Sequence, residues 1–483
     1  MPPNQTIVHS DEKSALLESE LVNQALVEEH YRTGPYDTEA GRRRHPRGRC
    51  ARLCKAFFWM VFGMFALTFF LRHSNRHFDL SNFWCIGSPK HRPMALSQCH
   101  SAPIAYKDGE LNYVFDVNAE SKPSSFFFGQ HYSRKSHDGP GFGFIQTAGR
   151  VIIQEAPEGA DPVTVSLRVH LSHEELRNAI SIKHDATGLT FESDRIIQRL
   201  GGVRPCIEVL ATISIAPSTN ISSFNIDTIV LPIELKESLK LNSHNTFIRS
   251  VSGGVTSGTD ALYSRKIEIE TTSGSITGSY PLADLLSLKT ISGTVQVNID
   301  PKDSDKSDHN GVLIIRGVSG TIHADTITTS IPSRTFNTQV HSRSGSISGT
   351  YLLGDRTTIE SNSGTVTVDI YTAGDLAKRV LTIDTVSGSI RSCVYDTAAK
   401  LGAVSSVFMT RSGTMQLQYP GSWEGKIQAQ TLSGSLSVTG EGVDIIKDVH
   451  PKPGFKQILA EKGDGDSNIS AENTSGSISV RIG

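Results

Sequence analysis

A Ser-Gly dipeptide that recurs ten times in the second half of the chain constrains the fold more than any other feature. Each copy is followed by Ser, Thr or Gly and then by an apolar residue. The corner serines, as we call them below, stand at positions 252, 273, 292, 319, 344, 363, 387, 412, 433 and 475. The spacing is 19–27 residues until the last interval of 42, which predicts a copy without the dipeptide around residues 450–458. Periods of this length are typical of stacked repeat proteins.

Two apolar columns flank the corner serine. The residue four positions before it is apolar in all ten copies, as at Ile248 and Ile359, and so is the residue three positions after it, as at Val255 and Val366. The columns lie seven residues apart, an odd number that would place them on opposite faces of one straight strand. We therefore expect the chain to turn at Ser-Gly, with glycine permitting a positive φ there, so that both columns enter one core.

A period near 20 residues with one corner per turn predicts a β-solenoid, a parallel β-helix-like stack, over residues 246–483. Coils stacked about 4.8 Å apart would form a rod of roughly 50 Å, with corner hydroxyls hydrogen-bonded along the stack. The longer intervals would contain loops, such as Lys302–Asn310. An antiparallel meander is the alternative, but it would invert alternate repeats and so fits ten equivalent corners less well.

Residues 103–245 also carry strand patterns, which makes the chain all-β from about residue 110. Val163–Leu171 and Ile207–Ile215 alternate apolar and polar residues, as half-buried strands do. His173–Asn178 is the one short helical pattern in this region. Residues 72–102 show no periodicity and are predicted to be a stem or linker.

An uncharged apolar run at 56–71 predicts a transmembrane helix. Sixteen residues span roughly 24 Å, slightly less than the hydrocarbon core, and Lys55 and Arg72 can extend toward the interfaces. A secretory signal peptide is disfavoured because 55 residues precede the run, and a core helix because the run is apolar all round. Seven Lys and Arg residues at 41–55 place the amino end in the cytoplasm and the rest outside or in a lumen, at the cell surface or an endomembrane.

Several modification sites are predicted from this topology. Asn220, Asn468 and Asn473 begin N-glycosylation sequons, and a disulfide between Cys85 and Cys99 would be stable outside the cytosol. Cys50 and Cys54 are juxtamembrane and are candidates for palmitoylation, with unmodified thiols as the alternative.

Residues 1–55 are predicted to be a largely disordered cytoplasmic tail that contains a sorting signal. Glu12, Leu16 and Leu17 match the acidic dileucine pattern that adaptor complexes bind, with the acid meeting a basic patch and the leucines entering apolar pockets. An amphipathic segment for some other partner is the alternative interpretation.

The repeat units resemble an adhesin-like domain family of unknown function found in bacteria and fungi. The likeness lies in Thr-x-Ser-Gly-x-Ile units such as Glu270–Ile276 and Asp384–Ile390, and it covers residues 246–483. With the single predicted span and the tail signal, the chain is similar to fungal membrane-anchored members. The resemblance implies a binding role, and no catalytic residues come with it.

Little in the sequence points to catalysis or to a cofactor. The position three before the corner serine is mostly charged, and stacked coils would bring Glu360 and Asp384 about 5 Å apart, near the separation in retaining glycosidases. Because other copies place varied polar residues there, a solvated face with ion pairs such as Glu270 to Lys289 is the preferred interpretation. Asp464–Asn468 begins like a calcium loop but lacks its glycine, and no spacing predicts a metal or nucleotide site.

The sequence therefore predicts a single-pass membrane protein, not an enzyme, whose repetitive β ectodomain binds a surface, a glycan or a protein. The balanced charge, 47 basic and 49 acidic residues, argues against nucleic acid. The alternatives are a ligandless scaffold trafficked to a vacuole or endosome and, less favoured, a carbohydrate-active β-helix enzyme.

Overall fold

The computed structural model describes residues 99, 102–117, 124–133, 142–198, 204–217, 219–237, 239–303, 310–397, 401–452 and 454–483. All of them belong to one compact unit, His91–Gly483. The predicted tail and membrane span, residues 1–71, lie outside the described residues. Among the residues that are described, no helix is long and apolar enough to cross a membrane.

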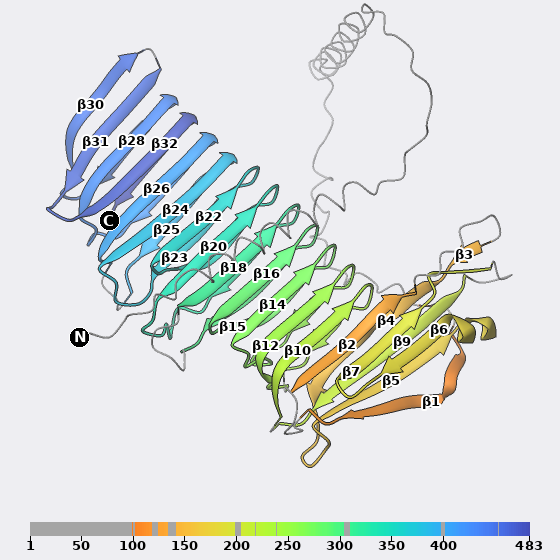
Figure 1. The fold of residues 1–483 in the computed structure, drawn as a ribbon. Helices are drawn as coiled ribbons and strands as arrows, with labels where there is room; N and C mark the ends of the chain where they lie inside the picture. The colour runs from red at the N-terminus through yellow and green to blue at the C-terminus, as the bar shows by residue number, and fades with distance from the viewer. Residues whose placement is uncertain are drawn as a thin grey trace, which may run out of the picture. The chain divides into compact units, whose positions relative to one another are not determined.

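Two long, mostly parallel sheets face each other in this unit (Figure 1). Sheet A has 15 strands and sheet B has 16, and from β10 to β29 consecutive strands alternate between them. In this stretch sheet B contains β10 (Asn220–Thr228), β12 (Asn242–Ser250), β14 (Lys266–Thr271), β16 (Leu285–Thr290), β18 (Gly311–Gly317), β20 (Phe336–Ser342), β22 (Arg356–Ser361), β24 (Lys378–Ser387), β26 (Ala403–Ser412) and β28 (Gly425–Ser433). Sheet A contains β11 (Ile233–Leu235), β13 (Val255–Ser257), β15 (Ile276–Leu282), β17 (Val295–Pro301), β19 (Ile322–Thr326), β21 (Ile347–Leu353), β23 (Val366–Thr372), β25 (Ile390–Tyr395), β27 (Met415–Tyr419) and β29 (Leu436–Gly440).

Each coil is one sheet B strand, a corner and one sheet A strand, and coils pair in parallel with their neighbours. This arrangement confirms the predicted parallel stack over the antiparallel meander. The stack begins before residue 246, because β10 and β11 form a coil whose corner, Ile229–Pro232, has no Ser-Gly. The predicted loop at Lys302–Asn310 falls between β17 and β18, and its residues 304–309 lie outside the described part.

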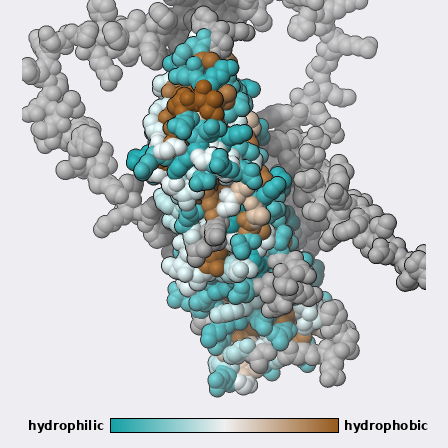
Figure 2. Space-filling model, turned by 90° about the vertical axis from the view of Figure 1, so that its left-hand side faces the viewer, coloured by the Kyte–Doolittle hydropathy of each residue, from teal (hydrophilic) through white to brown (hydrophobic). Residues whose placement is uncertain are grey.

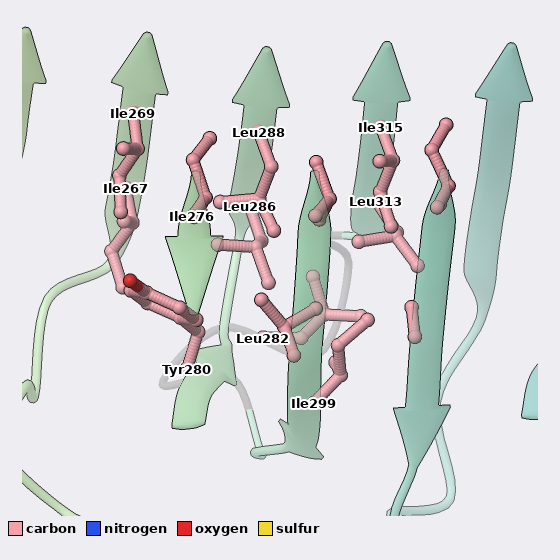
Figure 3. Close-up of a cluster of buried hydrophobic side chains, with 14 of the residues drawn as sticks. Ile267, Ile269, Ile276, Tyr280, Leu282, Leu286, Leu288, Ile299, Leu313 and Ile315 are labelled. Carbon is pink, nitrogen blue, oxygen red and sulfur yellow. The ribbon is translucent and has the colours of Figure 1, made fainter. Parts of the chain in front are cut away.

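Both predicted apolar columns point into the space between the sheets. Nineteen of their twenty side chains are buried, and the exception, Leu436, is half-buried on the edge strand β29. Figure 3 shows Ile269, Leu288 and Ile315 from sheet B packed beside sheet A side chains such as Ile276. Burying a side chain of this size stabilises the fold by about 1.5–3 kcal/mol, so every coil adds to one continuous core.

The corner glycines are required by a close backbone approach, and only three of them have a positive φ. A Cβ on any of the ten would lie within 2.4 Å of the carbonyl oxygen that the neighbouring coil presents at its own corner. Gly413, Gly434 and Gly476 have φ between 130° and 156°, and the other seven do not have positive φ. The expectation that glycine serves mainly to reach positive φ was therefore wrong for most corners, because stacked corners leave no room for a side chain.

Hydroxyl groups beside the corners hydrogen-bond along the stack, as predicted. In several copies the residue two before the corner serine donates to the corner glycine carbonyl of the adjacent coil, at 3.1 Å from Thr385 to Gly364 and 3.1 Å from Thr410 to Gly388. Thr271 instead donates to Gly274 of its own coil at 2.6 Å. In the last copy an amide replaces the hydroxyl, and Asn473 Nδ2 donates to Gly413 at 2.7 Å. These bonds satisfy carbonyl groups at the corners where they form.

The last coil lies out of sequence order. β32 (Ser467–Ser475) lies between β26 and β28, and β33 (Ile478–Ile482) lies between β27 and β29. Residues between these coils form a hairpin of β30 (Asp444–Lys452) and β31 (Phe455–Lys462), with β31 antiparallel to β28. The prediction of a degenerate repeat at 450–458 was therefore wrong, because the 42-residue interval contains a hairpin and a return of the chain.

The amino-terminal end contains both parallel and antiparallel strand pairs and a short 3-10 helix. The strands here are β1 (Ile104–Phe115), β2 (Ser125–Tyr132), β3 (Phe142–Phe144), β4 (Gln146–Glu155), β5 (Val163–Leu171), β6 (Ile180–His184), β7 (Gly188–Ser193), β8 (Ile196–Gln198) and β9 (Cys206–Ile215). The two predicted strands match β5 and β9, and the predicted helical turn is η1 (Glu174–Ala179), whose Leu176 is fully buried. β5 pairs antiparallel with both β1 and β9.

Candidate functional site: the outer face of sheet B

The residues three before each corner serine form one column on the outside of sheet B, which we call the outer column. In spatial order it runs Arg249, Glu270, Lys289, Arg316, His341, Glu360, Asp384, Met409, Glu472 and Gln430. All ten side chains are exposed or half-buried. Parallel pairing in strict register therefore aligns them, as the sequence predicted.

Neighbouring side chains in the outer column form ion pairs where their charges are opposite and lie close to like charges elsewhere. Lys289 Nζ lies 2.8 Å from Glu270 Oε1, which confirms the predicted cross-strand pair. His341 Nδ1 lies 3.5 Å from Glu360 Oε2. Glu360 in turn pairs in register with Asp384, which places two acids on adjacent strands. Partial burial first, and the Glu360 charge second, raise the pKa of Asp384 above its ordinary value of 3.8.

Replacing Asp384 with Asn should make the protein slightly more stable at neutral pH. A carboxyl whose pKa is raised on folding binds its proton more tightly in the folded state. The stability that this proton contributes is present below a pH of about 3.8 and is lost as the pH rises and Asp384 ionises. Thermal melts of D384N and the native chain should therefore differ at pH 7 and converge at acid pH. Glu360→Gln, which removes the repelling neighbour, is expected to shift the melting temperature in the same direction. A lower melting temperature for D384N at pH 7 would contradict this account.

A groove of about 400 Å³ lies over the carboxyl-terminal coils, at the end of the outer column. The buried residues Thr385, Thr410, Asn473 and Thr431 lie in that order across four adjacent strands and form one row of the lining, with more exposed residues on either side. Phe455, the first residue of β31, closes one end. The lining residues are Asp384, Thr385, Val386, Met409, Thr410, Arg411, Gln430, Thr431, Leu432, Phe455, Glu472, Asn473 and Thr474.

The groove exists because of the out-of-order coil and the hairpin. β32 contributes Glu472 and Thr474 to the lining, and β31 contributes Phe455. Met409, 39% exposed, provides apolar surface at a position where most other coils place a charged residue. Leu432, 52% exposed, adds apolar surface just before its corner serine. The repeat pattern did not predict this site, because the site is built from segments whose pairing order the pattern does not encode.

The groove combines apolar side chains with a few polar groups able to fix orientation. Val386, Met409, Leu432 and Phe455 supply the apolar part, while Asp384, Glu472, Gln430 and Arg411 supply acceptors and donors. Ligand pockets in proteins have this mixture and this range of volume. In the described part of the chain, no cluster of three or more His, Cys, Asp or Glu residues is arranged to bind a metal ion.

The three predicted glycosylation sites differ in how exposed they are in the structure. Asn220 and Asn468 are exposed, whereas Asn473 is 5% exposed and its Nδ2 is the donor to Gly413. A glycan on Asn473 would have to be attached to this buried nitrogen, so exposure favours the first two as acceptors. Glu12, Leu16, Leu17, Cys50 and Cys54 lie outside the described residues.

The predicted Cys85–Cys99 disulfide was wrong in its partner. Cys99 is bonded to Cys206, 107 residues away, with a Cα–Cα distance of 5.8 Å that suits a disulfide. Cys206 opens β9, and its amide donates to the Ser172 hydroxyl at 2.8 Å. Folding thus brings together two cysteines that are too far apart in the sequence for their pairing to be predicted from it. Cys85 lies outside the described residues.

Comparisons with known proteins do not establish a family. No family model matches the chain, and no curated protein matches it. Among solved structures, a "putative cell adhesion protein" from Clostridium sporogenes shares 9% identity, with 77% of this chain and 99% of that chain covered and a TM-score of 0.13. Likeness at this level supports no argument about function. The repetitive all-β architecture is shown by the structure, and membership of the adhesin-like family stays an expectation.

Proposed function

We propose that this chain is an adhesin-like binding protein whose β ectodomain holds a glycan in the groove on sheet B. The observation that supports the proposal is the composition of that groove. The apolar faces of sugar rings pack on side chains such as Leu432 and Phe455, and sugar hydroxyls bond to carboxylates and amides such as Glu472 and Gln430. The rigid stack holds these residues in place.

The membrane anchor, the adaptor-binding tail and the cell-surface or endomembrane location complete the proposal. They rest on the sequence of residues 1–71, with its apolar run and basic flank. An anchored stack would present the groove on the far side of the membrane from the tail. We propose no catalytic role, since Glu360 is absent from the groove lining and Asp384 alone represents the acidic pair there.

The full chain should retain at least one glycan on an array of cell-wall and cell-surface glycans, through the groove. Replacing Leu432 with Ala and Glu472 with Gln together should lower retention at least tenfold, about 1.4 kcal/mol, because one apolar contact and one acceptor are lost. The matched control is Ile291→Ala with Glu270→Gln, which alters the same two columns near the other end of the stack. Equal retention by the two double variants would refute the groove as the binding site.

A ligandless scaffold is the second candidate, favoured by the continuous core and the hydrogen-bonded corners. It predicts that the native chain retains no glycan while both double variants keep its melting temperature. A carbohydrate-active enzyme is the third candidate. Release of reducing ends from a retained polysaccharide, abolished by Glu360→Gln with Asp384→Asn, would establish it in place of the other two.

A further inference from the structure

The two sheets end unequally at the carboxyl-terminal end of the stack. Sheet A stops at β29, the partner of β28 in the last coil, whereas sheet B continues through β31 to its edge strand β30. Two strands of sheet B thus have no counterpart in sheet A. β29 is therefore the edge strand of sheet A, and β30 has no sheet A strand opposite its inner side.

Apolar side chains remain exposed at this end. Ile445 and Ile446 on β30 are 48% and 59% exposed, and Ile445 pairs with the buried Ala460, which places it on the inner side of the sheet. Leu436 and Val438 on β29 are only partly buried against the core. Figure 2 looks onto this end of the stack and shows hydrophobic surface among hydrophilic residues. The amino-terminal end differs, since η1 packs against β5 and β6 there with its fully buried Leu176.

The directions of the strands make this end complementary to itself. Sheet A strands run opposite to sheet B strands (Figure 3), and β30 runs in the sheet B direction because two antiparallel pairings separate it from β28. A two-fold axis parallel to the strands would place β30 of each copy beside β29 of the other, in antiparallel orientation. Both sheets would then continue across the contact. An axis perpendicular to the sheets would pair β30 with itself and leave a gap beneath it.

We propose that a second copy of this chain covers this end, in a two-fold, tail-to-tail pair with β30 of each copy beside β29 of the other. The contact buries Ile445 and Ile446 and completes the open end of both cores. It is closed, because each copy uses the same end under the two-fold axis, so it forms dimers and not fibres. Bulges after Ile445 and Val449 interrupt β30 and keep the strand pairing short, which also limits unspecific edge pairing.

The pair would give the proposed adhesive function a partner that does not depend on the glycan groove. The chain enters the stack at β1, at the end opposite to β30. In a tail-to-tail pair the two entry ends point away from each other, so copies anchored in two different membranes could meet. The partner is then a second copy of this chain on an opposing surface.

Sedimentation velocity of the full chain in detergent, over a hundredfold range of concentration, tests the pair. We expect a monomer–dimer equilibrium, and Ile445→Lys with Ile446→Lys should raise the dissociation constant at least tenfold. Ile291→Lys, which adds a lysine at the residue that follows β16 and is 46% exposed, should leave the equilibrium unchanged. A chain that stays monomeric throughout, or a dimer unaffected by the double substitution in a variant with native melting temperature, would overturn the proposal.

The same variants separate this inference from the glycan proposal. The Ile445 and Ile446 double variant should retain glycans like the native chain, because neither residue lines the groove. The Leu432 and Glu472 double variant should dimerise like the native chain. Loss of both properties in either double variant would show that the carboxyl-terminal end had unfolded, and it would contradict the independence of the two sites.

Discussion

Removing residues 467–483 is expected to unfold the carboxyl-terminal end of the stack, not merely to shorten the stack by one coil. The deleted coil lies between β26–β27 on one side and β28–β29 on the other, so its loss leaves a gap in both sheets. Its Ile469, Ala471, Ile478, Val480 and Ile482 are all buried. At about 1.5–3 kcal/mol for each large side chain, the loss rivals the 5–15 kcal/mol that stabilise a whole domain.

Hydrogen exchange measured by mass spectrometry would locate the effect. Amides of β28, β30 and β31 should lose their protection in the truncated chain, while those of β12–β23, whose neighbours are intact, should keep it. Adding a peptide of residues 466–483 in trans should restore protection in part, since the vacated slot still matches it. If β28 stays protected, it has moved against β26, and the inserted coil is dispensable.

Much of the stack follows from residues that can be identified without a structure. The columns of Ile248 and Val255 predicted a corner, two inward faces and the in-register outer column, because burial repeats identically in every coil. The same regularity accounts for the Glu270–Lys289 pair. Where each residue's environment depends only on the adjacent coil, a periodic sequence is enough to place it.

The errors concern the order in which segments meet. Nothing in the pattern of β32 distinguishes a coil that follows β29 from one inserted beside β26, since each carries the same corner and apolar columns. The disulfide partner of Cys99 and the groove that includes Phe455 depend on such long-range contacts. The repeat pattern shows that any two coils can stack on each other. Which coils actually become neighbours depends on the loop lengths and on the hairpin.

Replacing a corner glycine in mid-stack with alanine should be among the most damaging single substitutions, and Gly320 is the sharpest case. A Cβ there would lie 1.6 Å from the carbonyl oxygen of Gly293, a backbone atom that cannot turn aside. Two coils must separate or the corner must rotate, and either change breaks ladder hydrogen bonds along both sheets. We expect a loss of about 3 kcal/mol or more, in the upper range for single substitutions.

The nearby Gly317 provides the control for this substitution. A Cβ at Gly317 would come no closer than 3.4 Å to any atom, and most other coils already carry a hydroxyl side chain at the equivalent position. Thermal unfolding followed by circular dichroism should therefore show a clear drop in melting temperature for Gly320→Ala and little change for Gly317→Ala. Similar melting temperatures for the two variants would mean that the corners are not packed backbone against backbone. Close backbone packing would then not explain the ten Ser-Gly dipeptides.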